Sequence, residues 1–320
     1  GVLGFDTLMR VTTWITWITA ALTVVYLALV LPRIDMTAVL AMPAGSTAAV
    51  IGALVMVTTG FGLGWVNAAA DYSRYLPRSA STRGVVGWTT VGSALPVILL
   101  VVFGLLLVGS DPTLSDAIGA DPIGALTTVL PTWFLVPFAV VAILGLIGGI
   151  TMDIYSSGLS LLATGVPVSR PVATAIDGTI MTLGAVAVVF LSADFLGPFT
   201  GFLTTLGVVI AGWAGIVLAD ILLRRRDYAE ADLFSPRGVY GSANPAALGV
   251  LALAAVVGFG FVMNTSASWL SWQGYLLGLV GGRDGDWAYA NLGVLFALVI
   301  GFVGYLLLCR GRVAEQERRG

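Results

Sequence analysis

A glycine-rich stretch beside a tryptophan is the first feature of the sequence that could bind a ligand. Gly60, Gly62 and Gly64 alternate along an apolar run, and Trp65 and Asn67 follow at once. Glycine lowers helix propensity by about 1 kcal/mol relative to alanine and lets a ligand approach the backbone closely. The pattern predicts a broken helix that offers the flat face of Trp65 to a ring. The alternative is that these residues only pack against neighbouring helices.

An acidic residue stands in the middle of a second apolar run. Asp153 follows Gly148, Gly149 and Thr151, and no arginine lies at a comparable depth. A carboxylate at the centre of a membrane helix costs a few kcal/mol, so such residues usually face a cavity or a partner. We expect Asp153 to be protonated, to face water, or to receive donors from a ligand or an ion. The alternative is an Asp satisfied by neighbouring backbone or hydroxyl groups.

Other side chains that could catalyse a reaction are few. The chain has no His and no Lys, and its single Cys309 cannot form an internal disulfide. These absences exclude His-based metal sites, Ser-His-Asp triads and Schiff-base lysines. Asp71 and Asp220 each lie near arginines and predict interfacial ion pairs or gate contacts. Asp177, one to two turns into another apolar run, is open to a functional or a capping role.

The composition places these residues in a membrane. Of 320 residues, 58% are hydrophobic and 10% are charged, and the mean hydropathy is +0.98. A soluble domain carries about a quarter charged residues, so the composition excludes one. It also excludes a disordered chain and a nucleic-acid binder with a basic surface. The expected partner of such a chain is the lipid bilayer.

Eight continuous apolar stretches of about 20 residues predict an all-α polytopic membrane protein with eight transmembrane helices. They cover 12–31, 47–70, 85–109, 133–163, 171–192, 198–223, 245–263 and 288–309. The Trp- and Tyr-rich segment 266–280 is too short to span and predicts an interfacial connector. The segment 111–131, with three Asp among Pro and Gly, predicts a structured loop.

The arginines predict the orientation. Thirteen of the fifteen lie in segments on one side of the predicted spans, and only Arg33 and Arg283 lie on the other. The positive-inside rule then places both termini in the cytoplasm and requires an even number of spans. It makes 111–131 an extracellular loop and 224–244 a cytoplasmic loop.

Three blocks of the sequence resemble the purine–cytosine permease branch of the nucleobase:cation symporter-1 family. They read GWVNAAADYSRYLP at 64–77, DIYSSGLSLLATGVPVSRPVATAIDG at 153–178 and GWAGIVLADILLRRRDY at 212–228. The resemblance implies a LeuT-like fold of two inverted five-helix repeats and two further helices. The eight predicted helices would be helices five to twelve. Residues 1–320 would then be a single transporter domain whose first four helices are missing from this chain.

The resemblance also implies a substrate site. Gly64 and Trp65 match the Gly-Trp of the sixth helix, on which the substrate ring stacks. Asp153 matches the eighth-helix position, usually Asn or Asp, that contacts the substrate edge. We expect Asn67 to orient the broken helix. Helices one and three, in the missing N-terminal part, would supply the other half of the site.

The coupling ion is left open between H⁺ and Na⁺. The family's sodium site uses hydroxyl groups about a turn before the position of Asp153, but 147–150 reads Ile-Gly-Gly-Ile. This departure favours a proton, whereas backbone carbonyls could still bind Na⁺. The candidate coupling residues are Gly148, Gly149, Thr151 and Asp153. No cofactor and no metal site are expected.

The expected function is secondary active uptake of a nucleobase, such as cytosine or a purine, across the plasma membrane by symport with a cation. One alternative is transport of another heterocycle, such as a hydantoin, allantoin or a thiamine-like ring. The other classes are a polytopic membrane enzyme and a channel or scaffold subunit. The scattered acids disfavour an enzyme, and the lack of polar residues at the centre of most spans disfavours a channel. The base and the oligomeric state stay open.

Overall fold

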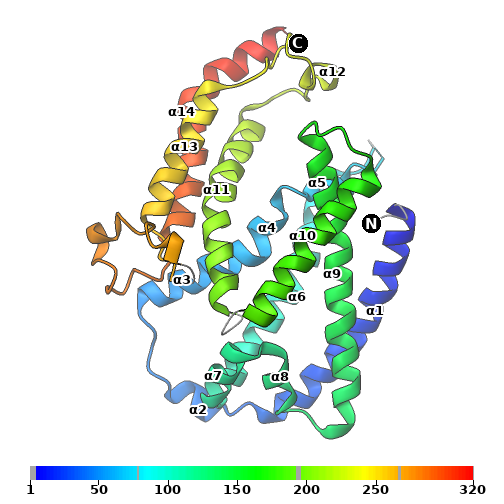
Figure 1. Ribbon diagram of the computed structural model, residues 1–320, viewed down its shortest axis with the longest axis vertical. Helices are drawn as coiled ribbons and strands as arrows, with labels where there is room; N and C mark the ends of the chain where they lie inside the picture. The colour runs from blue at the N-terminus through cyan, green and yellow to red at the C-terminus, as the bar shows by residue number, and fades with distance from the viewer. Residues whose placement is uncertain (1–4, 78, 192–195, 266–267, 320) are drawn as a thin grey trace. The chain divides into compact units, whose positions relative to one another are not determined.

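The computed structural model describes residues 5–77, 79–191, 196–265 and 268–319, and every secondary-structure element in them is helical (Figure 1). The long helices are α1 (Phe5–Val30), α6 (Thr82–Ser110), α9 (Leu135–Ala163), α10 (Arg170–Leu191), α11 (Leu196–Leu223) and α14 (Leu292–Arg319). The shorter α-helices are α2 (Met36–Ala41), α3 (Thr47–Val57), α4 (Gly64–Val66), α5 (Ala69–Ser73), α7 (Thr113–Ala120), α8 (Pro122–Thr127), α12 (Glu230–Leu233) and α13 (Pro245–Gly260). The 3₁₀ turns are η1 (Leu31–Arg33), η3 (Thr132–Phe134), η4 (Ser268–Leu270) and η5 (Leu277–Val280), and η2 (Thr58–Leu63) is a π-helical turn.

The described helices are those of a membrane protein, which confirms the predicted all-α polytopic class. Seven of them are long and apolar enough to cross a bilayer: Met9–Arg33, Thr47–Val66, Thr82–Ser110, Thr132–Ala163, Arg170–Leu191, Gly197–Leu223 and Leu292–Arg319. The one predicted span outside these seven, 245–263, corresponds to α13, which has 16 residues and a length of about 24 Å. The hydrocarbon core is about 30 Å thick, so the count of eight stays a prediction.

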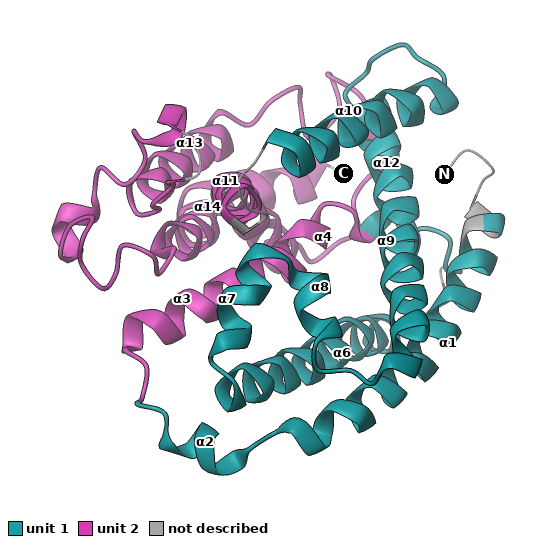
Figure 2. Ribbon diagram, turned by 60° about the horizontal axis from the view of Figure 1, so that its bottom comes forward, with its two compact units in different colours: residues 1–43, 70–196 teal, residues 44–69, 197–320 magenta. Residues whose placement is uncertain are grey.

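The chain divides into two compact units, which Figure 2 colours separately. Unit 1 comprises 1–43 and 70–196, and unit 2 comprises 44–69 and 197–320. Each unit is described by itself.

In unit 1, α9 packs against α1 on one side and α10 on another. The segment 111–131 forms α7 and α8, which bury Leu114 and Ala125 in a cluster with Phe134. Its acids have local roles, since Asp111 Oδ1 accepts from Thr113 N at 3.1 Å and Asp121 Oδ1 from Gly124 N at 2.9 Å. Asp121 is thus the N-cap of α8, and Asp111 forms an Asx turn just before α7.

In unit 2, α11, α13 and α14 pack through small residues. A Cβ on Gly215 would overlap the Leu298 carbonyl oxygen, and one on Gly301 would overlap the Gly212 carbonyl oxygen. The α11 and α14 backbones therefore approach each other closely, as membrane helices do where glycine removes the side chain. The buried cluster of Ala219, Tyr305, Cys309 and Val313 continues this contact to the ends of both helices.

In two segments the structure adds to the predicted helix boundaries. α14 continues ten residues past the predicted end at position 309, to Arg319. Val313 and Gln316 are buried there, so packing rather than lipid holds this last part of the helix. The described part of the connector, 268–280, contains only the 3₁₀ turns η4 and η5.

Candidate functional site

The glycine-rich stretch interrupts its helix. α3 ends at Val57, the π-helical turn η2 follows over Thr58–Leu63, and α4 occupies only Gly64–Val66. π-helical turns are rare and occur often at functional sites. Thr59 Oγ1 donates to the Val55 carbonyl at 2.7 Å, which gives the hydroxyl a partner inside its own helix. The broken helix that the glycines predict is thus a π turn followed by a short α-helical turn.

The residues after the π turn are open on one side. Trp65 exposes 38% of its surface, while Leu63 and Ala68 on either side of it are buried. A Cβ on Gly64 would meet nothing within 4 Å, so the backbone beside the indole is uncovered within the described chain. Asn67 ends α4, and its N–H bonds to the Trp65 carbonyl. Its side chain is exposed.

Asp153 lies on an open face of α9. Gly145 and Gly149 precede it at four-residue intervals, which places all three on one side of the helix. A Cβ on either glycine would meet nothing within 4 Å. Asp153 is exposed, and its carboxylate has no hydrogen-bond or ion-pair partner among the described residues. This face therefore presents bare backbone leading to one unpaired carboxylate.

The four candidate coupling residues do not all converge. Gly148 packs towards Ile15 of α1, since a Cβ there would lie 3.4 Å from Ile15 Cγ2. Thr151 Oγ1 donates to the Ile147 carbonyl at 2.6 Å. Two residues turn an α-helix by about 200°, so Thr151 and Asp153 point to nearly opposite sides. Only Gly149 shares the face of Asp153.

The two halves of the predicted substrate site belong to different units. Gly64, Trp65 and Asn67 lie in unit 2, and Asp153 lies in unit 1. The helical segment Thr47–Val66 therefore positions Trp65, and α9 positions Asp153.

A phenol bridge beyond Asp153 was not predicted from the sequence. The Tyr72 hydroxyl contacts the Met152 carbonyl and the Ser156 hydroxyl, both at 3.1 Å. Burial raises the pKa of Tyr72 above its usual value, so it stays a neutral donor. The bridge ties the segment after the broken helix to the turn of α9 that carries Asp153.

A second pair of phenols extends this contact. The Tyr75 and Tyr155 hydroxyls are 2.6 Å apart, and Arg74 Nη2 donates to the Tyr75 hydroxyl at 2.9 Å. The hydrogen bond with Tyr155, followed by that from Arg74, lowers the pKa of Tyr75. Arg170 lies 4.6 Å from the Tyr155 ring centre in a cation–π contact. The Asp-Tyr-Ser-Arg-Tyr run at 71–75 was the signal for this cluster, but its partners lie about eighty positions away.

A polar cavity of about 320 Å³ lies in unit 2 beside the first part of the broken helix. Its lining residues are uncharged: Gly52, Ala53, Met56, Thr200, Gly201, Thr204, Met263, Asn264, Thr265, Tyr289 and Asn291. Asn264 Nδ2 donates to the Gly201 carbonyl at 3.0 Å and to Thr205 Oγ1 at 3.1 Å. The volume falls at the lower end of ligand pockets. None of the predicted site residues lines it.

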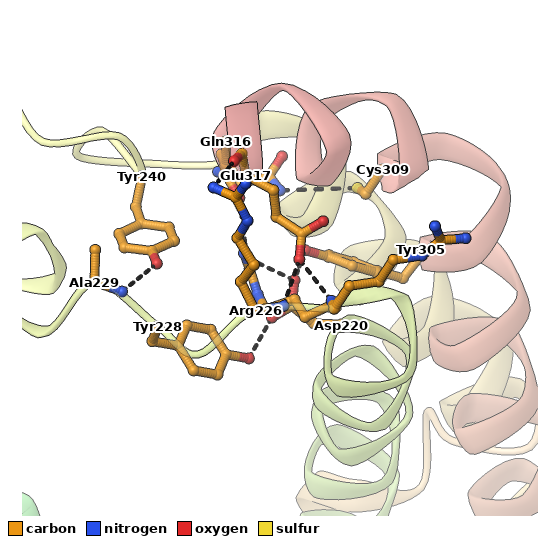
Figure 3. A network of polar contacts seen from close by, with 12 residues as sticks. Asp220, Arg226, Tyr228, Ala229, Tyr240, Tyr305, Cys309, Gln316 and Glu317 are labelled. Carbon is orange, nitrogen blue, oxygen red and sulfur yellow. Dashed lines mark hydrogen bonds and ion pairs between the residues drawn. The ribbon is translucent and has the colours of Figure 1, made fainter. Parts of the chain in front are cut away.

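The predicted ion pair at Asp220 is present at the ends of α11 and α14 (Figure 3). Arg224 Nε lies 2.7 Å from Asp220 Oδ2, and the Tyr228 and Tyr305 hydroxyls donate to the same carboxylate at 2.5 and 2.6 Å. Burial, with the hydrogen bond to Asp220, raises the pKa of Tyr228 to about 12. Arg224 Nη2 also donates to Gln316 Oε1 at 2.9 Å. The network joins the two helices.

The other acids differ from Asp220. Asp71 has no ion-pair partner in the described chain, and its neighbour Arg78 lies outside the described residues. Asp177 Oδ2 is buried without a hydrogen-bond partner among the described atoms. No group of three or more His, Cys, Asp or Glu that could hold a metal ion occurs within 5–77, 79–191, 196–265 and 268–319.

Membrane-length helices define a multi-pass membrane protein. One of them is interrupted by a π turn beside an exposed aromatic ring. The chain belongs to the family described as permeases for cytosine/purines, uracil, thiamine and allantoin, whose family model matches residues 1–287. This membership confirms the predicted family.

One curated relative is the purine-cytosine permease FCY21 of Saccharomyces cerevisiae. It is 23% identical over 254 residues, which cover 75% of this chain and 46% of the yeast protein. The chain therefore spans about half the length of this relative. No solved structure matches the chain.

Proposed function

We propose that the protein imports a nucleobase, such as cytosine or a purine, across the plasma membrane by symport with a cation. The family description and the name of the yeast relative support this substrate class. The family description also includes thiamine and allantoin, so another heterocycle is the second candidate. The observation that carries the proposal is the exposed Trp65 directly after the π turn, beside the uncovered Gly64.

The proposed roles follow from the chemistry of each group. The base stacks on the Trp65 indole, and Gly64 lets its edge approach the backbone. Stacking of a base on an aromatic side chain is worth about 1–3 kcal/mol. Asp153 accepts hydrogen bonds from ring N–H or exocyclic amine groups. Asn67 holds the end of α4 through its backbone bond to Trp65. Helices that the family resemblance places before this chain would complete the site.

We favour the proton as the coupling ion. A sodium site needs several oxygen ligands that converge, but Thr151 turns away from Asp153 and its hydroxyl is bonded to Ile147. An unpaired carboxylate such as Asp153 can take up and release a proton by itself. The Asp177 carboxylate, whose Oδ2 is buried without a hydrogen-bond partner among the described atoms, is the second candidate for this role.

The orientation is part of the proposal. The thirteen arginines on one side of the predicted spans support cytoplasmic termini, an extracellular 111–131 segment and a cytoplasmic 224–244 segment.

Uptake by the full-length protein in proteoliposomes tests the substrate and the ion together. We expect saturable uptake of labelled cytosine, or of a competing purine, driven by an inward proton gradient, with the base recovered chemically unchanged. Asp153→Asn keeps the shape and one acceptor oxygen but cannot carry a proton, so it should keep exchange and lose uphill uptake. Asp177→Asn tests the second candidate in the same way. Loss of coupling only in Asp177→Asn would transfer the role to that residue, and uptake driven by sodium alone would refute proton coupling.

A further inference from the structure

The ends of α11 and α14 in unit 2 form a basic groove next to the Asp220 network, and none of the predicted substrate-site residues lines it (Figure 3). The groove has a volume of about 640 Å³. Four arginines line it: Arg225 and Arg226, which follow α11, and Arg310 and Arg318, which lie on α14. Leu223 and Val313 form part of its floor.

The positive charge of this groove is only partly compensated. Glu317 is the one acid among the described lining residues, and its carboxylate accepts the backbone N–H groups of Arg225 at 2.6 Å and Arg226 at 3.0 Å. Arg226 Nη1 donates to the Glu317 carbonyl at 2.9 Å. The exposed guanidinium groups of Arg225, Arg310 and Arg318 have no hydrogen-bond or ion-pair partner within the described chain. Three cationic groups are thus free to bind an anion.

An apolar surface leads directly to the groove. On α14, Leu307, Arg310, Ala314 and Arg318 follow one another at intervals of three or four residues, so they share one face of the helix. Leu307 is 67% exposed, as is Leu222 near the end of α11. One turn of helix therefore separates lipid-facing leucine from unpaired arginine. A ligand that fits must be anionic at one end and apolar at the other.

We propose that this groove binds the phosphate headgroup of an anionic phospholipid in the leaflet at this end of the helices. The acyl chains lie along the exposed leucines of α11 and α14. Arginine suits this ligand, because its planar guanidinium donates two parallel hydrogen bonds to phosphate oxygens. Basic pockets between membrane helices are known sites for such headgroups. The lipid would bridge Arg225 after α11 to Arg310 and Arg318 on α14, and so hold the two helix ends together.

Lipid binding to the full-length protein in detergent tests the site. The probes are phosphatidylglycerol, phosphatidylcholine and soluble glycerol 3-phosphate, measured by native mass spectrometry and by the shift of the unfolding temperature. The test variant is Arg225→Gln/Arg310→Gln/Arg318→Gln, which spares Arg226 and its bond to Glu317. The matched control is Arg10→Gln/Arg83→Gln/Arg237→Gln, which removes three exposed arginines elsewhere.

We expect wild type and control to bind phosphatidylglycerol at least about tenfold more tightly than phosphatidylcholine, and the groove variant to lose most of this preference. Arg318→Gln alone should lose part of it, which keeps the test valid if the triple variant unfolds. Equal affinity for the two lipids in wild type would overturn the proposal. Equal loss in both triple variants would show a general charge effect instead. Glycerol 3-phosphate binding as tightly as phosphatidylglycerol would make this a site for free phosphate esters and refute the lipid.

Discussion

Removing the Asp220 carboxylate should destabilise the contact between α11 and α14. The carboxylate accepts four hydrogen bonds, two from Arg224 and one each from the Tyr228 and Tyr305 hydroxyls. The side chains of Arg224 and Asp220 are only 9% and 14% exposed. Asp220→Ala therefore leaves a nearly buried guanidinium and two phenols without their acceptor.

The expected cost follows from this burial. Removing one partner of a buried ion pair costs about 3–5 kcal/mol, because the remaining charge is uncompensated. The pair lies at a helix end and Arg224 keeps its bond to Gln316, so we expect a loss near the lower limit, about 3 kcal/mol. At about 2–4 °C per kcal/mol, the unfolding temperature in detergent should fall by roughly 6–12 °C. Intrinsic tryptophan fluorescence during heating would measure it.

The chain offers a matched control with the same spacing. Glu315 and Arg319 also form an ion pair between an acid and the arginine four residues later, but these side chains are 51% and 68% exposed. Exposed pairs of this kind contribute about 0.3–0.5 kcal/mol, so Glu315→Ala should shift the unfolding temperature by only a degree or two. Removing both Asp220 and Arg224 should cost less than the sum of the single changes. A loss for Asp220→Ala no larger than that for Glu315→Ala would refute the reasoning.

Three further predictions follow from other parts of the chain. Trp65→Ala should weaken base binding by the full-length protein roughly tenfold or more, and Trp65→Phe by less, because stacking contributes about 1–3 kcal/mol; equal affinities in a binding assay would reduce Trp65 to a packing residue. The pKa of Tyr228 rises from about 10 when unfolded to about 12 when folded, so its neutral form stabilises the fold below pH 10 and this contribution disappears as the pH passes 12. The unfolding temperature of wild type should therefore drop more between pH 10 and 12 than that of Tyr228→Phe, and parallel curves would contradict this. The orientation can be tested with a membrane-impermeant thiol reagent in a Cys309→Ala background, because the native Cys309 is buried. Arg237→Cys should be labelled only after permeabilisation, whereas Ser115→Cys should be labelled in intact cells. The opposite pattern would show that the predicted orientation is wrong.

The sequence was most informative about the membrane helices. A continuous apolar segment in lipid forms an α-helix, because a helix hydrogen-bonds its own backbone N–H and C=O groups. The long described helices accordingly lie close to the predicted ranges. The extension of α14 was not predicted, because 310–319 is polar and only tertiary packing buries Val313 and Gln316. The glycines at 60–64 predicted an interruption, but the π turn itself depends on backbone geometry that composition does not encode.

For the candidate site, the spacing of residues along α9 predicted which side chains share a face better than their residue types did. The four-residue interval between Gly149 and Asp153 puts both on one open face, whereas Thr151, a plausible ion ligand by type, turns away. The Tyr72–Ser156 bridge joins residues 84 positions apart. The polar run at 71–75 indicates one side of this contact, but nothing local in the sequence identifies its partner. The roles assigned to Trp65 and Asp153 are still predictions.

Counterflow through the full-length protein in proteoliposomes tests the central proposal most directly. Vesicles loaded with unlabelled cytosine would be given trace labelled cytosine, with wild type, Asp153→Ala and the control Asp116→Ala, whose carboxylate lies in α7. The account predicts saturable exchange by wild type and control. Asp153→Ala should give none, because loss of a charged acceptor leaves the donors of the base unpaired. Exchange by Asp153→Ala at the affinity and rate of wild type, or flux that never saturates, would contradict it.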